Sequence, residues 1–89
     1  MASESFRITG RVQQVGFRAY VLGQAELLGL SGETWNSLDG SVQVIAAHPQ
    51  QAVLDELESA LWNGPGKVEN VRREPAPDPQ PGFRITPTR

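Results

Sequence analysis

Apolar side chains follow two different periods near the start of the chain. In residues 6–12 they fall mostly on every second position, which is the pattern of a strand with one buried face. In residues 17–28 they recur at helical spacing and form one stripe, which predicts an amphipathic helix that ends at Gly29. We therefore expect a strand that passes through a short loop into a helix, preceded by a frayed terminus at residues 1–5.

The next part of the chain has the pattern of a β-hairpin. Residues 32–37 and 41–47 are predicted strands, and in the second of them apolar residues alternate with other side chains. Leu38-Asp39-Gly40 lies between the two strands. An Asp-Gly pair readily supplies the positive φ that hairpin turns need, so this tripeptide is the predicted turn.

A second helix is expected to follow the hairpin. Pro49 can occupy its first position, where the missing N–H breaks no hydrogen bond. Predicted strands at residues 67–73 and 82–86 flank a Pro-rich segment, residues 75–81. This segment must be a surface loop, because proline suits neither a helix interior nor a central strand. The predicted buried stripe of the second helix is Val53, Leu57, Ala60 and Leu61.

The predicted elements come in the order strand, helix, strand, strand, helix, strand, with a short closing strand. Each helix has one apolar stripe, so two helices are expected to pack on one face of a mostly antiparallel sheet. This is an α+β fold, the ferredoxin-like two-layer sandwich or βαββαβ arrangement. With 89 residues the chain, residues 1–89, is expected to form a single domain. Many unrelated functions occur on this fold, so the fold alone does not define one.

Composition argues against several classes of protein. The chain has no cysteine, which excludes disulfides, cysteine-ligated metal centres and a cysteine nucleophile. It has one histidine, His48, so we expect no metal site and no cofactor. The net charge of −2 argues against a nucleic-acid partner, which requires a basic surface. No apolar run approaches the ~18 residues of a membrane span, so we expect no membrane partner, a cytoplasmic location and, from the small size, a monomer.

The segment from Gly10 to Arg18 carries the clearest chemical signal. Backbone N–H groups at a helix N-terminus have no intrahelical partner, and together with the helix dipole they form an anion site. Arg18 lies against that dipole at a cost of roughly 0.3–1 kcal/mol, which a bound anion would remove. Its guanidinium can bind the same anion in a bidentate manner. Taken alone, the pattern also fits an exposed turn, and it is not a nucleotide-binding P-loop because Gly16 is not followed by Lys-Ser or Lys-Thr.

Asn36 is the second candidate residue. It ends the predicted strand that leads into the hairpin turn, and a carboxamide offers the acceptor and donors needed to orient a water molecule. The alternative interpretation is an Asx-turn residue that caps the hairpin. Residues 6–12 and 34–37 need not pair directly in this topology, but their ends can lie side by side at one edge of the sheet.

Two motifs together resemble the acylphosphatase family. They are Gly10-x-Val12-Gln13-x-Val15-Gly16-Phe17-Arg18 and Asn36-x-x-Asp39-Gly40, with Gly64-Pro65 further along. The resemblance covers residues 6–85 and implies hydrolysis of the carboxyl-phosphate bond of acyl phosphates, without a metal or a covalent intermediate. It also implies that Arg18 binds phosphate and that Asn36 positions the attacking water. The implied phosphate-binding loop consists of Gln13, Gln14, Val15, Gly16, Phe17 and Arg18.

Two positions depart from the family pattern. Gln14 stands where many members have glycine, so a backbone φ that favours glycine would be strained there. Trp35 stands directly before Asn36, where the family often has a basic residue. This second departure either changes the contacts to the substrate or places a packing residue on the sheet.

The implied chemistry suits so small a set of residues. An acyl phosphate expels a carboxylate, whose conjugate acid has a pKa of ~4, so no strong general acid is needed. The protein has only to bind the phosphoryl group and hold water in line with it. Two alternatives remain: a non-catalytic anion-sensing or interaction domain on the same fold, and an RNA-binding module, which the acidic charge disfavours. The expected partners are a small acyl phosphate and inorganic phosphate, as product and competitor.

Overall fold

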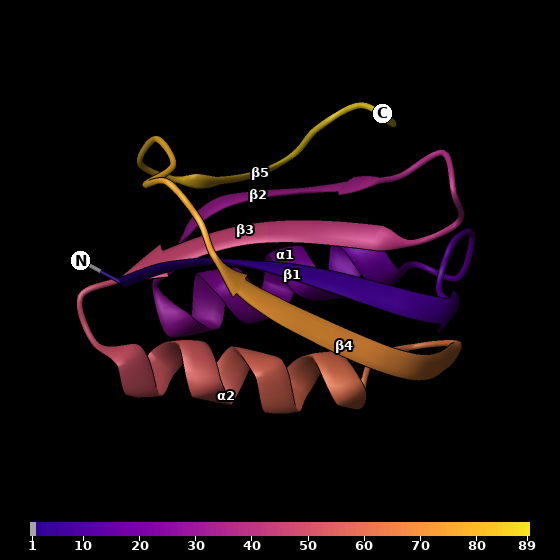
Figure 1. The fold of residues 1–89 in the computed structure, drawn as a ribbon, viewed down its shortest axis with the longest axis horizontal. Helices are drawn as coiled ribbons and strands as arrows, with labels where there is room; N and C mark the ends of the chain where they lie inside the picture. Colours follow the sequence, from indigo (N-terminus) through magenta and orange to yellow (C-terminus); the bar gives the residue numbers. More distant parts are fainter. Residues whose placement is uncertain (1) are drawn as a thin grey trace.

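Seven elements follow one another in the computed structural model, which describes residues 2–89 (Figure 1). Their order confirms the predicted α+β, ferredoxin-like fold. The first helix has its predicted bounds, and Gly29, with a φ of 69°, ends it as expected. The elements are β1 Ala2–Arg11, α1 Phe17–Leu28, β2 Ser31–Asn36, β3 Val42–His48, α2 Gln51–Trp62, β4 Lys67–Pro75 and β5 Phe83–Ile85.

The five strands form one sheet in the order β4-β1-β3-β2-β5. β1 pairs antiparallel with both β3 and β4, and β2 pairs antiparallel with β3. The closing strand β5 pairs parallel with β2, so the sheet is mixed. β3 therefore separates β1 from β2, and the two helices cover the same face of the sheet (Figure 1).

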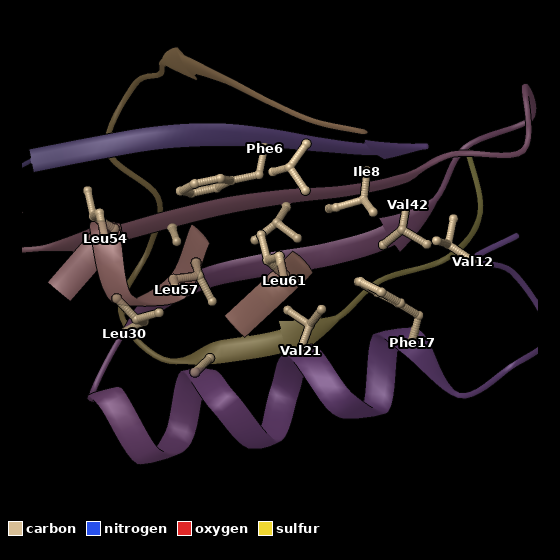
Figure 2. Close-up of a cluster of buried hydrophobic side chains, with 14 residues drawn as sticks. Phe6, Ile8, Val12, Phe17, Val21, Leu30, Val42, Leu54, Leu57 and Leu61 are labelled. Atoms are coloured by element: carbon tan, nitrogen blue, oxygen red, sulfur yellow. The ribbon is translucent and has the colours of Figure 1, made fainter. Parts of the chain in front are cut away.

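The hydrophobic core lies between the sheet and the two helices (Figure 2). Phe6 and Ile8 of β1 are fully buried, as the two-residue period predicts. The predicted stripe of the second helix was partly wrong: Leu54 is fully buried, whereas Val53 and Ala60 are only partly buried. The helix docks through its larger leucine side chains because they remove more apolar surface from water. Its buried residues are Leu54, Leu57 and Leu61.

Residues 2–5 are not frayed, contrary to the prediction, whereas Met1 lies outside the described residues. They extend β1 and pair with β3, from Ala2 opposite His48 to Ser5 opposite Ile45. The Glu4 carboxylate also forms an ion pair with Arg73 on β4, at 2.6 Å. These partners are 40 or more residues away in the sequence, so the composition of residues 2–5 gave no local sign of a strand.

The second helix begins two residues later than predicted. Gln50 is its N-cap residue and Gln51 its first helical residue, so Pro49 precedes the helix. The amide of Gln50 donates to the Nδ1 of His48 at 3.0 Å, which closes a turn across the proline. Each helix has 12 residues, and no helix within residues 2–89 is long and apolar enough to cross a membrane.

A β-bulge explains the irregular apolar pattern of β4. Thr9 pairs with Asn70, but Gly10 pairs with Val68, so Glu69 is an extra residue on β4. The extra residue allows Val68 and Val71, three positions apart, to face the same core. Gly10 adopts a φ of 123° at this bulge, and a Cβ there would lie 2.2 Å from the carbonyl oxygen of Lys67. Only glycine fits this position without a rearrangement.

Candidate active site

The loop between β1 and α1 turns sharply through two residues in the left-handed region. Gln14 has a φ of 61° and Gly16 a φ of 82°. Gln14 is the only non-glycine residue among residues 2–89 with a positive φ. The strain expected from the glutamine at this position is therefore present, at a cost of about 1–2 kcal/mol. The left-handed turns fold the loop back so that it leads directly into the first turn of α1.

The N-terminus of α1 has the features of an anion site. Gly16 is the N-cap residue, no side chain caps the helix, and the first turn contains no acidic residue. Within residues 2–89, the first amide of this turn that donates to a backbone carbonyl is that of Tyr20, which donates to the carbonyl of Gly16 at 3.0 Å. The earlier amides and the positive end of the helix dipole are thus available to a ligand.

A cavity of about 200 Å³ lies at this helix terminus. It brings together Arg18, from the first turn of α1, and Asn36, the last residue of β2. Figure 1 shows why: the β1–α1 loop and the turn between β2 and β3 lie at the same end of the molecule. The lining residues are Val12, Gln14, Gly16, Phe17, Arg18, Ala19, Asn36 and Ile85.

Alternation along β2 determines which of its side chains faces the cavity. Thr34 is fully buried on the face that packs against the helices, and Asn36 lies two residues further on the same face. Trp35 lies on the opposite face, where the guanidinium of Arg89 stacks on its ring at 3.8 Å. Of the two interpretations of Trp35, the structure supports packing on the sheet, since this side chain does not line the cavity.

Asn36 is not the residue that caps the hairpin turn. Asp39 has that role: its Oδ1 accepts hydrogen bonds from the amide and the hydroxyl of Ser41, at 3.0 and 2.7 Å. These bonds, together with an ion pair to Arg7 at 2.5 Å, hold the pKa of the Asp39 carboxyl well below its ordinary value. Within residues 2–89 the side chain of Asn36 forms no hydrogen bond. Its carboxamide is therefore available to a molecule in the cavity.

Two of the predicted loop residues direct their side chains away from the cavity. The Nε2 of Gln13 donates to the carbonyl oxygens of Ser37 and Ser41, at 2.7 and 3.0 Å. Val15 packs against the hydrophobic core. Both residues lie in the segment predicted to bind phosphate, but their side chains support the loop rather than line the cavity.

Phe17 anchors the loop to the core beneath it. Its ring is almost completely buried, next to Val12 and Val42 in Figure 2. A Cβ on Gly64 would lie 2.4 Å from this ring, so glycine is needed there for the ring to keep its position. Gly64 thus supports the residue that directly precedes Arg18.

Ile85 is a cavity residue that the sequence reasoning missed. It is the last residue of β5, it is 41% exposed, and it lines the same cavity as Arg18. Nothing in the local sequence indicated this, because the position of Ile85 depends on the parallel pairing of β5 with β2. Among residues 2–89 there is no group of three or more His, Cys, Asp or Glu side chains arranged for a metal ion.

The chain is similar to known proteins over most of its length. A family model described as "Acylphosphatase" matches residues 4–85. An acylphosphatase of Sinorhizobium medicae is 45% identical over 84 residues, which cover 90% of this chain and 88% of that protein. An acylphosphatase of Chromohalobacter salexigens is 44% identical over 77 residues, 84% of each chain. A solved structure of an acylphosphatase from Coxiella burnetii superposes with a TM-score of 0.89 at 31% identity, and covers 96% of this chain and 92% of that one.

These similarities show that the protein is a hydrolase with a ferredoxin-like fold. The chain belongs to the acylphosphatase family.

Proposed function

We propose that this protein hydrolyses the carboxyl-phosphate bond of acyl phosphates to a carboxylate and inorganic phosphate. In this proposal Arg18 and the backbone amides of residues 13–18 bind the phosphoryl group, and Asn36 orients the attacking water. The observation that carries it is the cavity at the N-terminus of α1, which contains both Arg18 and Asn36. Family membership supports the same reaction.

The chemistry explains why so few side chains are sufficient. The leaving carboxylate is the conjugate base of an acid with a pKa of ~4, so it departs without protonation. The remaining tasks are to stabilise the charge on the phosphoryl oxygens and to hold water in line with the breaking bond. The charge on the phosphoryl oxygens is stabilised by a guanidinium, a row of amides and a helix N-terminus. The water is held by a carboxamide.

Asn36 is not a general base, because a carboxamide does not accept a proton near neutral pH. In our proposal the water passes its proton to a phosphoryl oxygen of the substrate itself. The histidine, His48, ends β3 at the opposite end of that strand from Val42, which pairs with Asn36. A pH-rate profile that requires a protein base titrating near neutrality would contradict this step.

The test is the release of phosphate from benzoyl phosphate in excess chelator, with inorganic phosphate as competitor. We expect Arg18→Gln to lose both turnover and inhibition by phosphate, because binding in the ground and transition states is removed. Asn36→Ala should retain phosphate inhibition and lose kcat by about 100-fold or more. Arg72→Gln and Asn70→Ala, exposed positions on β4, are the matched controls and should behave like the wild type.

The outcomes separate the proposal from its alternative. Equal turnover in the wild type and Asn36→Ala would refute the role of Asn36. Saturable binding of phosphate without any turnover in the wild type would instead favour a non-catalytic anion-sensing domain.

A further inference from the structure

Residues 86–89 continue along the outer edge of β2, beyond the end of β5. The amide of Thr86 donates to the carbonyl of Thr34 at 2.9 Å, and the amide of Arg89 donates to the carbonyl of Asn36 at 3.0 Å. The amide of Leu38 in turn donates to the carbonyl of Arg89, also at 3.0 Å. Arg89 is thus bonded to two residues of the neighbouring segment, Asn36 and Leu38, which lie two positions apart. This is the hydrogen-bond pattern of parallel strands.

Without these residues, one side of Asn36 would be an open strand edge. On its other side Asn36 pairs with Val42 of β3. β5 itself pairs only with Gly32, Glu33 and Thr34, two residues short of Asn36. Arg89 therefore provides the backbone partner of Asn36 on the outer edge, directly before the hairpin turn.

The side chain of Arg89 holds the opposite face of the same strand. Its guanidinium stacks on the ring of Trp35 at 3.8 Å, and its Nη2 lies 2.6 Å from the Oε1 of Glu33. The same Nη2 donates to the hydroxyl of Thr86 at 3.0 Å. Trp35 and Glu33 share one face of β2, and Asn36 projects from the other face towards the cavity. Arg89 thus fixes β2 through both its backbone and its side chain at the position of Asn36.

We propose that Arg89 is a positioning residue for the reaction, which holds the backbone of Asn36 so that its carboxamide keeps water in line with the phosphoryl group. This inference rests on the proposed function of Asn36. In-line attack is sensitive to position, since a displacement of about 1 Å can cost 100-fold in rate. Arg18 and the loop amides belong to α1 and to the loop before it rather than to β2, so phosphate binding is expected to be insensitive to Arg89.

Two substitutions and one truncation test this. We expect Arg89→Ala to lower kcat about 5-fold to 10-fold, and a chain that stops after Thr86 to lower it more, because the backbone bonds to Asn36 and Leu38 are then also absent. In both, the inhibition constant of phosphate should stay within about twofold of the wild type. Arg89→Lys, which retains the cation over Trp35, should recover part of the loss.

Arg84→Ala is the matched control. Arg84 is an equally charged, 43% exposed side chain 3.9 Å from the same Glu33 carboxylate, but it contacts neither Trp35 nor the backbone of Asn36. Its kcat should stay within about twofold of the wild type. An equal loss in Arg84→Ala and Arg89→Ala, or a parallel loss of phosphate binding in Arg89→Ala, would overturn the proposal.

A second measurement does not depend on turnover. The side-chain amide resonance of Asn36, assigned by its disappearance in Asn36→Asp, is expected to shift or broaden in Arg89→Ala and to remain unchanged in Arg84→Ala. An unchanged resonance in Arg89→Ala together with an unchanged kcat would overturn the role of Arg89. A wild type without turnover, in which Arg89→Ala still alters the resonance, would instead overturn the proposed function and leave the contact between Arg89 and Asn36 intact.

Discussion

The side chain of Gln13 links the loop before α1 to the hairpin turn after Asn36. Its Nε2 donates to the carbonyl of Ser37, the residue that follows Asn36, at 2.7 Å. A second bond from the same nitrogen, to the carbonyl of Ser41 at 3.0 Å, reaches the residue directly before β3. The loop that leads to Arg18 is thus bonded directly to both ends of the hairpin turn that follows Asn36, although β3 separates β1 from β2 in the sheet.

Removing this bridge should affect catalysis more than phosphate binding. We expect Gln13→Ala to reduce the free energy of unfolding by about 1–3 kcal/mol, the range for two lost hydrogen bonds. Because the loop and the hairpin could then move apart, kcat should fall about 10-fold or more. Urea denaturation and benzoyl phosphate kinetics measure the two effects. Gln43→Ala is the control. The side-chain amide of Gln43 donates to the hydroxyl of Ser41, but it forms no hydrogen bond to the loop. A similar loss of kcat in both variants would argue against the bridge.

Gln14→Gly should relieve backbone strain without loss of ligand binding. A left-handed φ costs a side-chain-bearing residue about 1–2 kcal/mol, whereas glycine adopts it freely but loses more entropy on folding. We therefore expect the free energy of unfolding to rise by up to about 1 kcal/mol. Gln14→Val should lower it, since β-branched residues rarely adopt a positive φ. Phosphate affinity, measured by calorimetry, should be retained in Gln14→Gly, and a clear decrease would indicate that the glutamine side chain itself contacts the anion.

Two Gly→Ala substitutions should have opposite effects on stability. A Cβ at Gly64 would lie 2.4 Å from the buried ring of Phe17, so Gly64→Ala should cost about 1–3 kcal/mol and weaken phosphate binding through the displaced start of α1. A Cβ at Gly23, inside α1, meets nothing within 4 Å. Gly23→Ala should therefore raise the free energy of unfolding by about 0.5–1 kcal/mol. Thermal unfolding of the two variants checks the prediction, and destabilisation by both would contradict it.

The ion pairs of Arg73 should make stability dependent on acid pH. Arg73 contacts Glu4, Asp55 and Glu58 at 2.6–2.8 Å, and its hydrogen bond to Glu4 holds the pKa of that carboxyl below its ordinary value. A group with a lowered pKa in the folded state stabilises the fold above its unfolded pKa, about 4.3 for Glu, and this contribution is lost as the pH falls through the folded value. The wild type should therefore lose stability from about pH 5 downward.

Arg73→Met tests the origin of that loss. The variant keeps an apolar stem beside Phe6 but removes the cation, so it should be less stable than the wild type at pH 7 by about 1–3 kcal/mol. At pH 3 the difference should be smaller, because the protonated carboxyl no longer benefits from the guanidinium. Urea denaturation at the two pH values measures it. A difference that is the same at both pH values would show that packing, rather than charge, is what Arg73 contributes.

The sequence alone determined the order of the elements, the helix at residues 17–28 and the location of Arg18 at its start. These features follow from the spacing of apolar residues and from the glycines at which the chain turns, and both are local properties of the chain. It also placed Asn36 at the end of a strand next to a tight turn. Those features were enough to expect an anion site at the start of the helix and a second polar residue nearby.

Contacts between distant segments decided the rest. The bulge at Glu69, the pairing of residues 2–5, the place of Ile85 in the cavity and the course of residues 86–89 along β2 all depend on strand register. Likewise, the loop sequence did not show that Gln13 bonds to the hairpin while Gln14 lines the cavity. A local pattern records which face of an element is apolar, but the partner that each polar side chain meets is set only when the sheet assembles.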